Sequence, residues 1–142
     1  MEKLSVLADI LSIIGFLFTM ISWWFILQVK KSISFRSNVI QYIKDIDNIS
    51  KEITSLLSNY ESNLDEIYEL VMRVEAKLGH LESGAKSKLK EHINEAKENI
   101  IKYKNIHNRA TQESKVREIK TKLTIIVDEL EMQKRKYLIG VN

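Results

Sequence analysis

An unbroken run of apolar residues near the start of the chain is the clearest pattern in the sequence. No charge occurs between Asp9 and Lys30, and residues 10–29 read ILSIIGFLFTMISWWFILQV. Twenty helical residues at about 1.5 Å each span roughly 30 Å, the thickness of the hydrocarbon core of a bilayer. In lipid the segment must be helical, because a helix satisfies its own backbone polar groups. The pattern therefore predicts a transmembrane anchor over residues 1–31.

The residues that flank this run predict how it sits in a membrane. Trp23 and Trp24 lie one to two turns before Lys30 and Lys31, where interfacial aromatic residues and cations are expected. Lys3 is the single cation before the run, so the positive-inside rule places the C-terminal side in the cytoplasm. We expect a single-pass protein of the bacterial inner membrane. The alternative, a cleaved signal peptide, normally has a shorter apolar run and a small-residue cleavage site.

One face of the apolar helix carries nearly all of its small and polar residues. They recur at steps of three and four and fall within an arc of roughly 140°: Ser5, Asp9, Ser12, Gly15, Thr19 and Ser22. Small residues let helices approach closely in lipid, so this stripe predicts a helix-packing or pore-lining face. For Asp9 three interpretations stay open: a hydrated interfacial carboxylate, a ring of carboxylates at a pore mouth, or a salt bridge to another membrane protein.

Beyond the anchor, residues 32–142 show helical periodicity in place of continuous hydrophobicity. Apolar residues alternate steps of four and three, with one polar member, in a series typical of a coiled-coil seam: Val39, Ile43, Ile46, Ser50, Ile53, Leu57, Tyr60, Leu64, Ile67, Val71, Val74, Leu78 and Leu81. Ser83–Gly84–Ala85 predicts a turn, after which a weaker seam resumes. Proline is absent and only four glycines occur, so the fold class is all-α.

Two architectures fit this cytoplasmic region. The continuous first seam favours an antiparallel hairpin of two long helices, which would bring Lys134, Arg135 and Lys136 near the bilayer surface. The alternative is a compact four-helix bundle, formed if both helices fold at weak points near residues 59–63 and 107–114. A parallel oligomeric coiled coil is compatible with either form. For the basic cluster, the alternative is a solvated helix end.

The charges of the cytoplasmic region are divided between its halves. Residues 37–85 hold four basic and nine acidic residues, whereas residues 86–142 hold fourteen basic and eight acidic residues. The basic residues are interleaved with acids, which favours pairing of the two halves over binding to nucleic acid. We therefore expect no nucleic-acid partner.

The sequence contains no pattern that indicates catalysis. It has no cysteine, no phosphate-binding glycine loop, no nucleophile elbow and no paired histidine and glutamate of a helical metal site. The three histidines do not converge in sequence. We therefore expect no catalytic residue, no metal, no cofactor and no enzymatic activity.

Two functions remain as expectations. The first is a membrane effector of the toxin or defence type, whose copies associate through the transmembrane helix and the coiled coil and form a pore or disturb the bilayer. The second is a membrane-tethered scaffold or adaptor that recruits or positions a protein partner. The expected partners are the lipid bilayer, further copies of the chain, and a second membrane or cytoplasmic protein. The polar stripe favours the effector, because a simple anchor does not need one.

Overall fold

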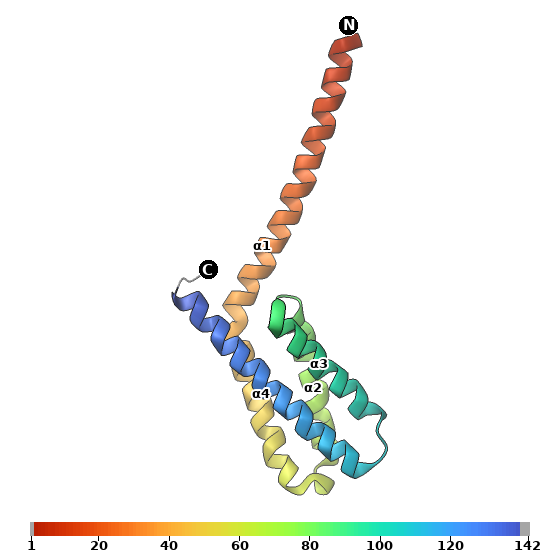
Figure 1. Cartoon of the computed structure of the whole chain (residues 1–142), viewed down its shortest axis with the longest axis vertical. Helices are drawn as coiled ribbons and strands as arrows, with labels where there is room; N and C mark the ends of the chain where they lie inside the picture. Colours follow the sequence, from red (N-terminus) through yellow and green to blue (C-terminus); the bar gives the residue numbers. More distant parts are fainter. Residues whose placement is uncertain (1, 140–142) are drawn as a thin grey trace. The chain divides into compact units, whose positions relative to one another are not determined.

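The computed structural model describes the backbone of residues 2–139 and the side chains of residues 11–30 and 33–137. All regular secondary structure in this part of the chain is helical: α1 (Glu2–Leu56), the 3-10 helix η1 (Leu57–Ser62), α2 (Leu64–Glu82), α3 (Ser87–Asn105) and α4 (Arg109–Ile139) (Figure 1). This confirms the prediction of an all-α chain that begins with a long apolar helix. Contacts within the chain divide it into two units, Met1–Ser34 and Phe35–Asn142.

The first unit is the apolar part of α1. Every side chain from Leu11 to Lys30 is exposed, and Phe18 and Trp23 keep 69% and 67% of their surface accessible. Among the described residues, this is the one helix long and apolar enough to cross a membrane, judged by length and composition. Apolar side chains therefore lie exposed on all sides of this helix.

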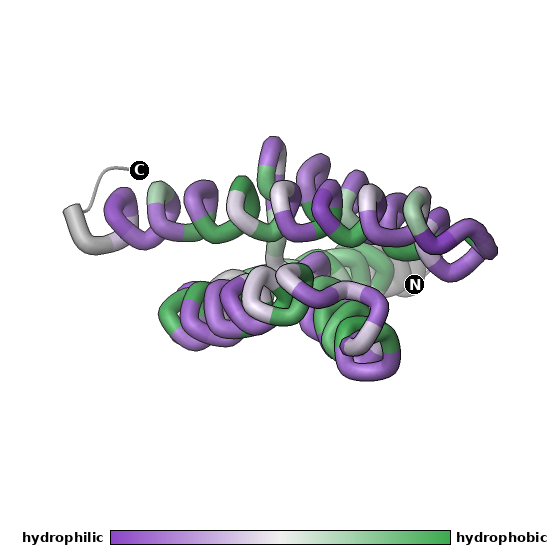
Figure 2. Tube along the Cα trace, turned by 90° about the horizontal axis from the view of Figure 1, so that it is seen from below, coloured by the Kyte–Doolittle hydropathy of each residue, from purple (hydrophilic) through white to green (hydrophobic). Residues whose placement is uncertain are grey.

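The second unit has a hydrophobic core to which α1, η1, α2, α3 and α4 all contribute. Figure 2 shows the hydrophobic side of α4 facing the other helices and its outer side coloured as hydrophilic. Of the thirteen residues of the predicted first seam, all but Ile43 and Leu64 are buried, and those two are partly buried against the core. The first seam is therefore occupied by contacts inside one chain.

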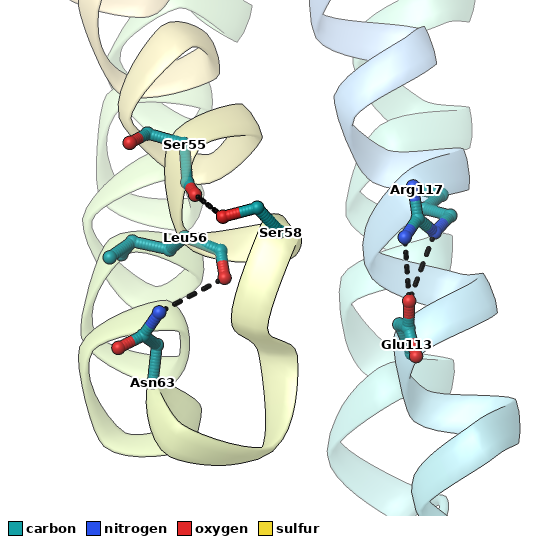
Figure 3. A network of polar contacts seen from close by, with 6 residues as sticks. All are labelled: Ser55, Leu56, Ser58, Asn63, Glu113 and Arg117. Carbon is teal, nitrogen blue, oxygen red and sulfur yellow. Dashed lines mark hydrogen bonds and ion pairs between the residues drawn. The ribbon is translucent and has the colours of Figure 1, made fainter.

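The chain reverses direction at η1, at the weak point where the four-helix alternative requires a break. Asn59 adopts a non-helical conformation (φ −138°, ψ 66°), and α1 has ended at Leu56. Asn63 precedes α2, but its side chain does not cap that helix; its Nδ2 donates to the carbonyl oxygen of Leu56 at 3.1 Å (Figure 3). The continuous first helix that the long hairpin requires is thus interrupted, because side-chain bonding to the backbone competes with the helical ladder.

The expected turn at Ser83–Gly84–Ala85 lies between α2 and α3. Gly84 is required there by a close approach: a Cβ atom built on it would lie 2.7 Å from both Cβ and Cγ of Phe35. Phe35, the first residue of the second unit, is 6% exposed. The aromatic ring thus fixes the start of this unit against the α2–α3 turn.

A second break separates α3 from α4 at residues 106–108, at the start of the weak region expected over 107–114. Asn108 lies directly before α4 and caps its N-terminus: its Oδ1 accepts a hydrogen bond from the backbone N–H of Thr111 at 3.1 Å. The Gln112 side chain donates to the Ile106 carbonyl at 2.5 Å. These local bonds satisfy backbone groups that the interrupted helix leaves unpaired.

Ion pairs link each helix of the second unit to the next one along the chain. Lys77 contacts Asp45 at 2.5 Å between α2 and α1, and Lys122 contacts Glu95 at 2.5 Å between α4 and α3. The pairs between α3 and α2 are Lys97–Glu82 and Lys104–Glu75, both at 2.6 Å. These last two join the acidic half of the sequence to its basic half.

Candidate functional site

The described part of the polar stripe lies on one exposed face of α1. Ser12, Gly15, Thr19 and Ser22 are all exposed, and no atom lies within 4 Å of a Cβ placed on Gly15. The Thr19 hydroxyl donates to the Gly15 carbonyl oxygen at 2.9 Å. This bond satisfies the hydroxyl proton within the helix, so the face can meet a neighbouring helix without burying an unpaired donor.

Other predicted membrane residues are described in part. Ser5 and Asp9 belong to the helical backbone of α1, but their side chains, like that of Lys31, lie outside the described residues. Trp23, Trp24 and Lys30 are exposed, and their location at a membrane interface stays a prediction. The core of the second unit begins at Phe35.

The C-terminal basic cluster, Lys134–Arg135–Lys136, lies on α4 beside the start of the second unit. The Arg36 guanidinium stands 4.7 Å from the centre of the Tyr137 ring, in a cation–π contact. Lys134 is 3.9 Å from Glu131, while Arg135 and Lys136 are exposed. Arg36 follows the apolar run by a few residues in the sequence.

The histidines and carboxylates of the described region form no group capable of holding a metal ion. His80 and His107 are exposed, whereas His92 is partly buried with its Nδ1 at 3.7 Å from Glu95. The Glu95 carboxylate is held mainly by the Lys122 ammonium, which lowers its pKa below the ordinary value. His92 therefore lies on α3 beside the ion pair of Glu95 with Lys122, which links α3 to α4, and we assign it a structural role.

Two tyrosines form the most deeply buried polar pair of the second unit. Tyr60 and Tyr103 are 5% and 4% exposed, and the Tyr60 hydroxyl makes no hydrogen bond of good geometry. Burial raises the pKa of both phenols, and the neighbouring Tyr60 raises that of Tyr103 further. Both groups therefore stay protonated at neutral pH, and we assign them a packing role beneath Tyr68, whose ring centre is 6.3 Å from that of Tyr103.

A pocket of about 280 Å³ opens where the end of α1 and η1 faces α4. Its lining consists of two cations, three hydroxyls and one apolar residue: Arg117, Lys120, Thr54, Ser58, Thr121 and Leu57. Sequence reasoning missed it, because its two halves are about sixty residues apart. The sequence did contain polar residues spaced one helical turn apart in both segments, Thr54 with Ser58 and Arg117 with Thr121. Such spacing is common on helix surfaces, so it does not indicate a pocket before the fold is known.

Comparisons of the chain with protein-family models, curated proteins and solved structures found no match.

Proposed function

We propose that the chain is a single-pass membrane protein whose α1 helix anchors a cytoplasmic helical domain. The exposure of every apolar side chain between Leu11 and Val29 carries this proposal. Each large apolar side chain left in water forgoes about 1.5–3 kcal/mol of burial free energy, and a bilayer supplies that burial on all sides of a helix. Lys30, Lys31 and Arg36 follow the run, so the second unit is proposed to face the cytoplasm of a bacterial inner membrane.

We propose that the second unit works as a compact four-helix bundle. The reversal at η1, the break after Asn105 and a core shared by all the helices support this form over the long hairpin. Because the first seam is buried within the chain, that seam is not free to form a coiled coil with a second copy. Self-association is therefore assigned to the transmembrane helix.

The polar stripe is the proposed contact between copies, and the proposed activity is that of a membrane effector. Gly15 offers an open approach, and Thr19 contributes a hydroxyl whose lone pairs stay available to a neighbouring helix. Copies that assemble on this face would bring their Asp9 residues to one end of the assembly, where a ring of carboxylates favours cations. Assembly would then form a pore or disturb the bilayer.

The basic cluster is proposed to bind the anionic cytoplasmic leaflet. The contact of Tyr137, next to the cluster, with Arg36, which follows the apolar run in the sequence, supports this proposal. Each cation at such a surface contributes about 1 kcal/mol. This contact would hold the bundle close to the bilayer.

The alternative function is a membrane-tethered scaffold. Large apolar side chains remain exposed on the bundle, among them Ile40, Tyr68 and Ile101. Where such residues form a contiguous patch, they mark a surface that binds a protein partner. A scaffold would need the anchor but not the stripe, and this difference separates the two functions experimentally.

The mass of the full-length protein in nanodiscs tests the effector. We expect an assembly of at least four or five copies that dissociates when Ser12, Gly15 and Thr19 are changed to leucine. The control changes Ile14→Leu, Leu17→Met and Ile21→Leu on the opposite face and should preserve the assembly. A monomer or dimer unaffected by either set would exclude the self-assembled pore and favour the scaffold. If the assembly forms, Asp9→Asn should reduce cation flux into vesicles.

A further inference from the structure

The pocket between the α1–η1 corner and α4 has the composition of an anion-binding site. Two cations and three hydroxyls surround an opening of about 280 Å³, and no carboxylate is among the residues that line it. Leu57, which is 6% exposed, adds an apolar wall. Arginine, lysine and hydroxyl groups together are the donors that hold phosphoryl groups in proteins.

Lys120 is the most informative residue of this pocket. Its side chain is partly buried, and no ion pair to it occurs within the described part of the chain. Its neighbours on α4 differ: Lys122 is paired with Glu95 at 2.5 Å, and Lys115 with Glu118 at 2.5 Å. A bound anion would supply the counterion that this ammonium lacks among the described residues.

Arg117 is engaged but not saturated. Its Nε and one terminal nitrogen donate to Oε1 of Glu113, at 3.2 and 2.6 Å (Figure 3). A guanidinium has five N–H donors, so three remain for another acceptor. Glu113 also holds the head group in one orientation, which lowers the entropy lost when a ligand binds. The same carboxylate repels anions, and binding must exceed that repulsion.

The three hydroxyls are held by local bonds that a ligand can replace. Thr54 donates to the Ser50 carbonyl at 2.8 Å, Ser58 to the Ser55 carbonyl at 2.7 Å, and Thr121 to the Arg117 carbonyl at 3.0 Å. The Ser58 bond is drawn in Figure 3. The carbonyls of Ser50 and Arg117 also lie within the helical ladder, so turning those two hydroxyls toward an anion leaves no backbone acceptor unpaired.

We propose that this pocket binds a small soluble phosphomonoester through Lys120, Arg117 and the adjacent hydroxyls. Its volume lies just below the range of about 300–1,000 Å³ usual for drug-sized ligands, which suits one phosphate with a small attached group. The phosphate accepts hydrogen bonds from both cations, and Leu57 contacts the attached group. The site does not rest on the proposed membrane function.

A lipid head group shares this chemistry. The titrations below, in neutral nanodiscs and in nanodiscs that contain anionic lipid, distinguish it from a soluble ligand.

Calorimetric titration of the full-length protein in neutral nanodiscs with AMP, and separately with pyrophosphate, tests the site. We expect saturable binding that weakens as salt rises. Lys120→Gln should weaken it at least about tenfold, the loss expected for a charge-assisted hydrogen bond. Thr121→Val should weaken it less. The matched control is Lys102→Gln, the same change of charge at an exposed position of α3, which should leave binding unchanged.

Three outcomes would overturn the proposal: no saturable binding of either probe up to about 10 mM, an unchanged affinity in Lys120→Gln, or equal losses in Lys120→Gln and Lys102→Gln. Urea unfolding of each variant separates lost binding from lost folding. In nanodiscs that contain anionic lipid, an unchanged AMP affinity supports a soluble ligand, whereas competitive loss would identify a lipid head group. Neither result depends on whether copies assemble through α1.

Discussion

Residues 11–30 and residues 35–137 are both helical, yet their apolar side chains have opposite surroundings. In the first segment Phe18, Trp23 and their neighbours are exposed on every side of α1. In the second, Ile53, Leu89 and Leu123 are fully buried against other helices of the same chain. Both segments therefore share helical backbone hydrogen bonding, and they differ in whether their apolar side chains pack against other helices of the chain.

The largest expected effect is the loss of stability when a core side chain of the second unit is removed. Leu123→Ala removes a side chain with no exposed surface and should lower the free energy of unfolding of the second unit by about 2–5 kcal/mol. Leu17→Ala, at a residue that is 52% exposed in α1, should leave that unfolding transition unchanged. Urea denaturation of both variants in micelles, followed by circular dichroism, measures the difference. Equal effects would show that the two units do not unfold separately.

An intermediate effect is expected where the second unit begins. Gly84→Ala should destabilise the bundle by about 1–3 kcal/mol, because the new methyl group overlaps the Phe35 ring. Gly79→Ala is the matched control: nothing lies within 4 Å of its Cβ, and alanine in a helix should stabilise by about 0.5–1 kcal/mol. Thermal melts of the two variants should therefore shift in opposite directions.

A double variant tests whether overlap with the Phe35 ring causes the destabilisation expected for Gly84→Ala. Adding Phe35→Ala to Gly84→Ala removes the ring that the methyl group meets, so the double variant should cost less than the sum of the single changes. Additive losses would assign the cost of Gly84→Ala to the backbone of the turn.

The smallest effect concerns the ion pair between α1 and α2. The Lys77 ammonium, through its hydrogen bond, lowers the pKa of Asp45 against the opposing effect of burial. A lowered folded-state pKa stabilises the fold above the unfolded value of about 3.9, and this stabilisation is lost as pH falls through the folded-state pKa. Asp45→Asn should cost less than about 1 kcal/mol at pH 7 and less still near pH 2. Urea midpoints at the two pH values measure this; an equal cost at both would exclude the charge as its origin.

The sequence was sufficient for features that depend on local pattern. The apolar run, the all-α class and the turn at Ser83–Gly84–Ala85 follow from hydrophobicity and from the few residues that interrupt helices. The two further breaks were recognised as weak points, but periodicity alone did not show that the chain would bend there. At η1 the seam residues Leu57 and Tyr60 are buried although the helix is interrupted. The apolar pattern in the sequence therefore continues through the break and does not reveal it.

Features that depend on contacts between distant residues could not be predicted. The approach of Phe35 to Gly84 joins positions 49 residues apart, and the pocket joins Thr54 to Thr121. A phenylalanine, a glycine or a threonine does not by its type indicate which distant residue it will contact. The roles of the polar stripe and the basic cluster stay predictions, because they concern a bilayer and further copies of the chain.

The composition of the core has a consequence for how the helices find their alignment. Apart from Ser50, its described buried members are apolar or aromatic, and most are isoleucine, leucine or valine. Such side chains can exchange places at little cost, so a helix displaced by one turn would meet similar neighbours. A displacement by one turn would break the approach of Phe35 to Gly84 and the pairing of Tyr60 with Tyr103. These aromatic residues therefore oppose a shift of register, and the aliphatic residues supply the cohesion.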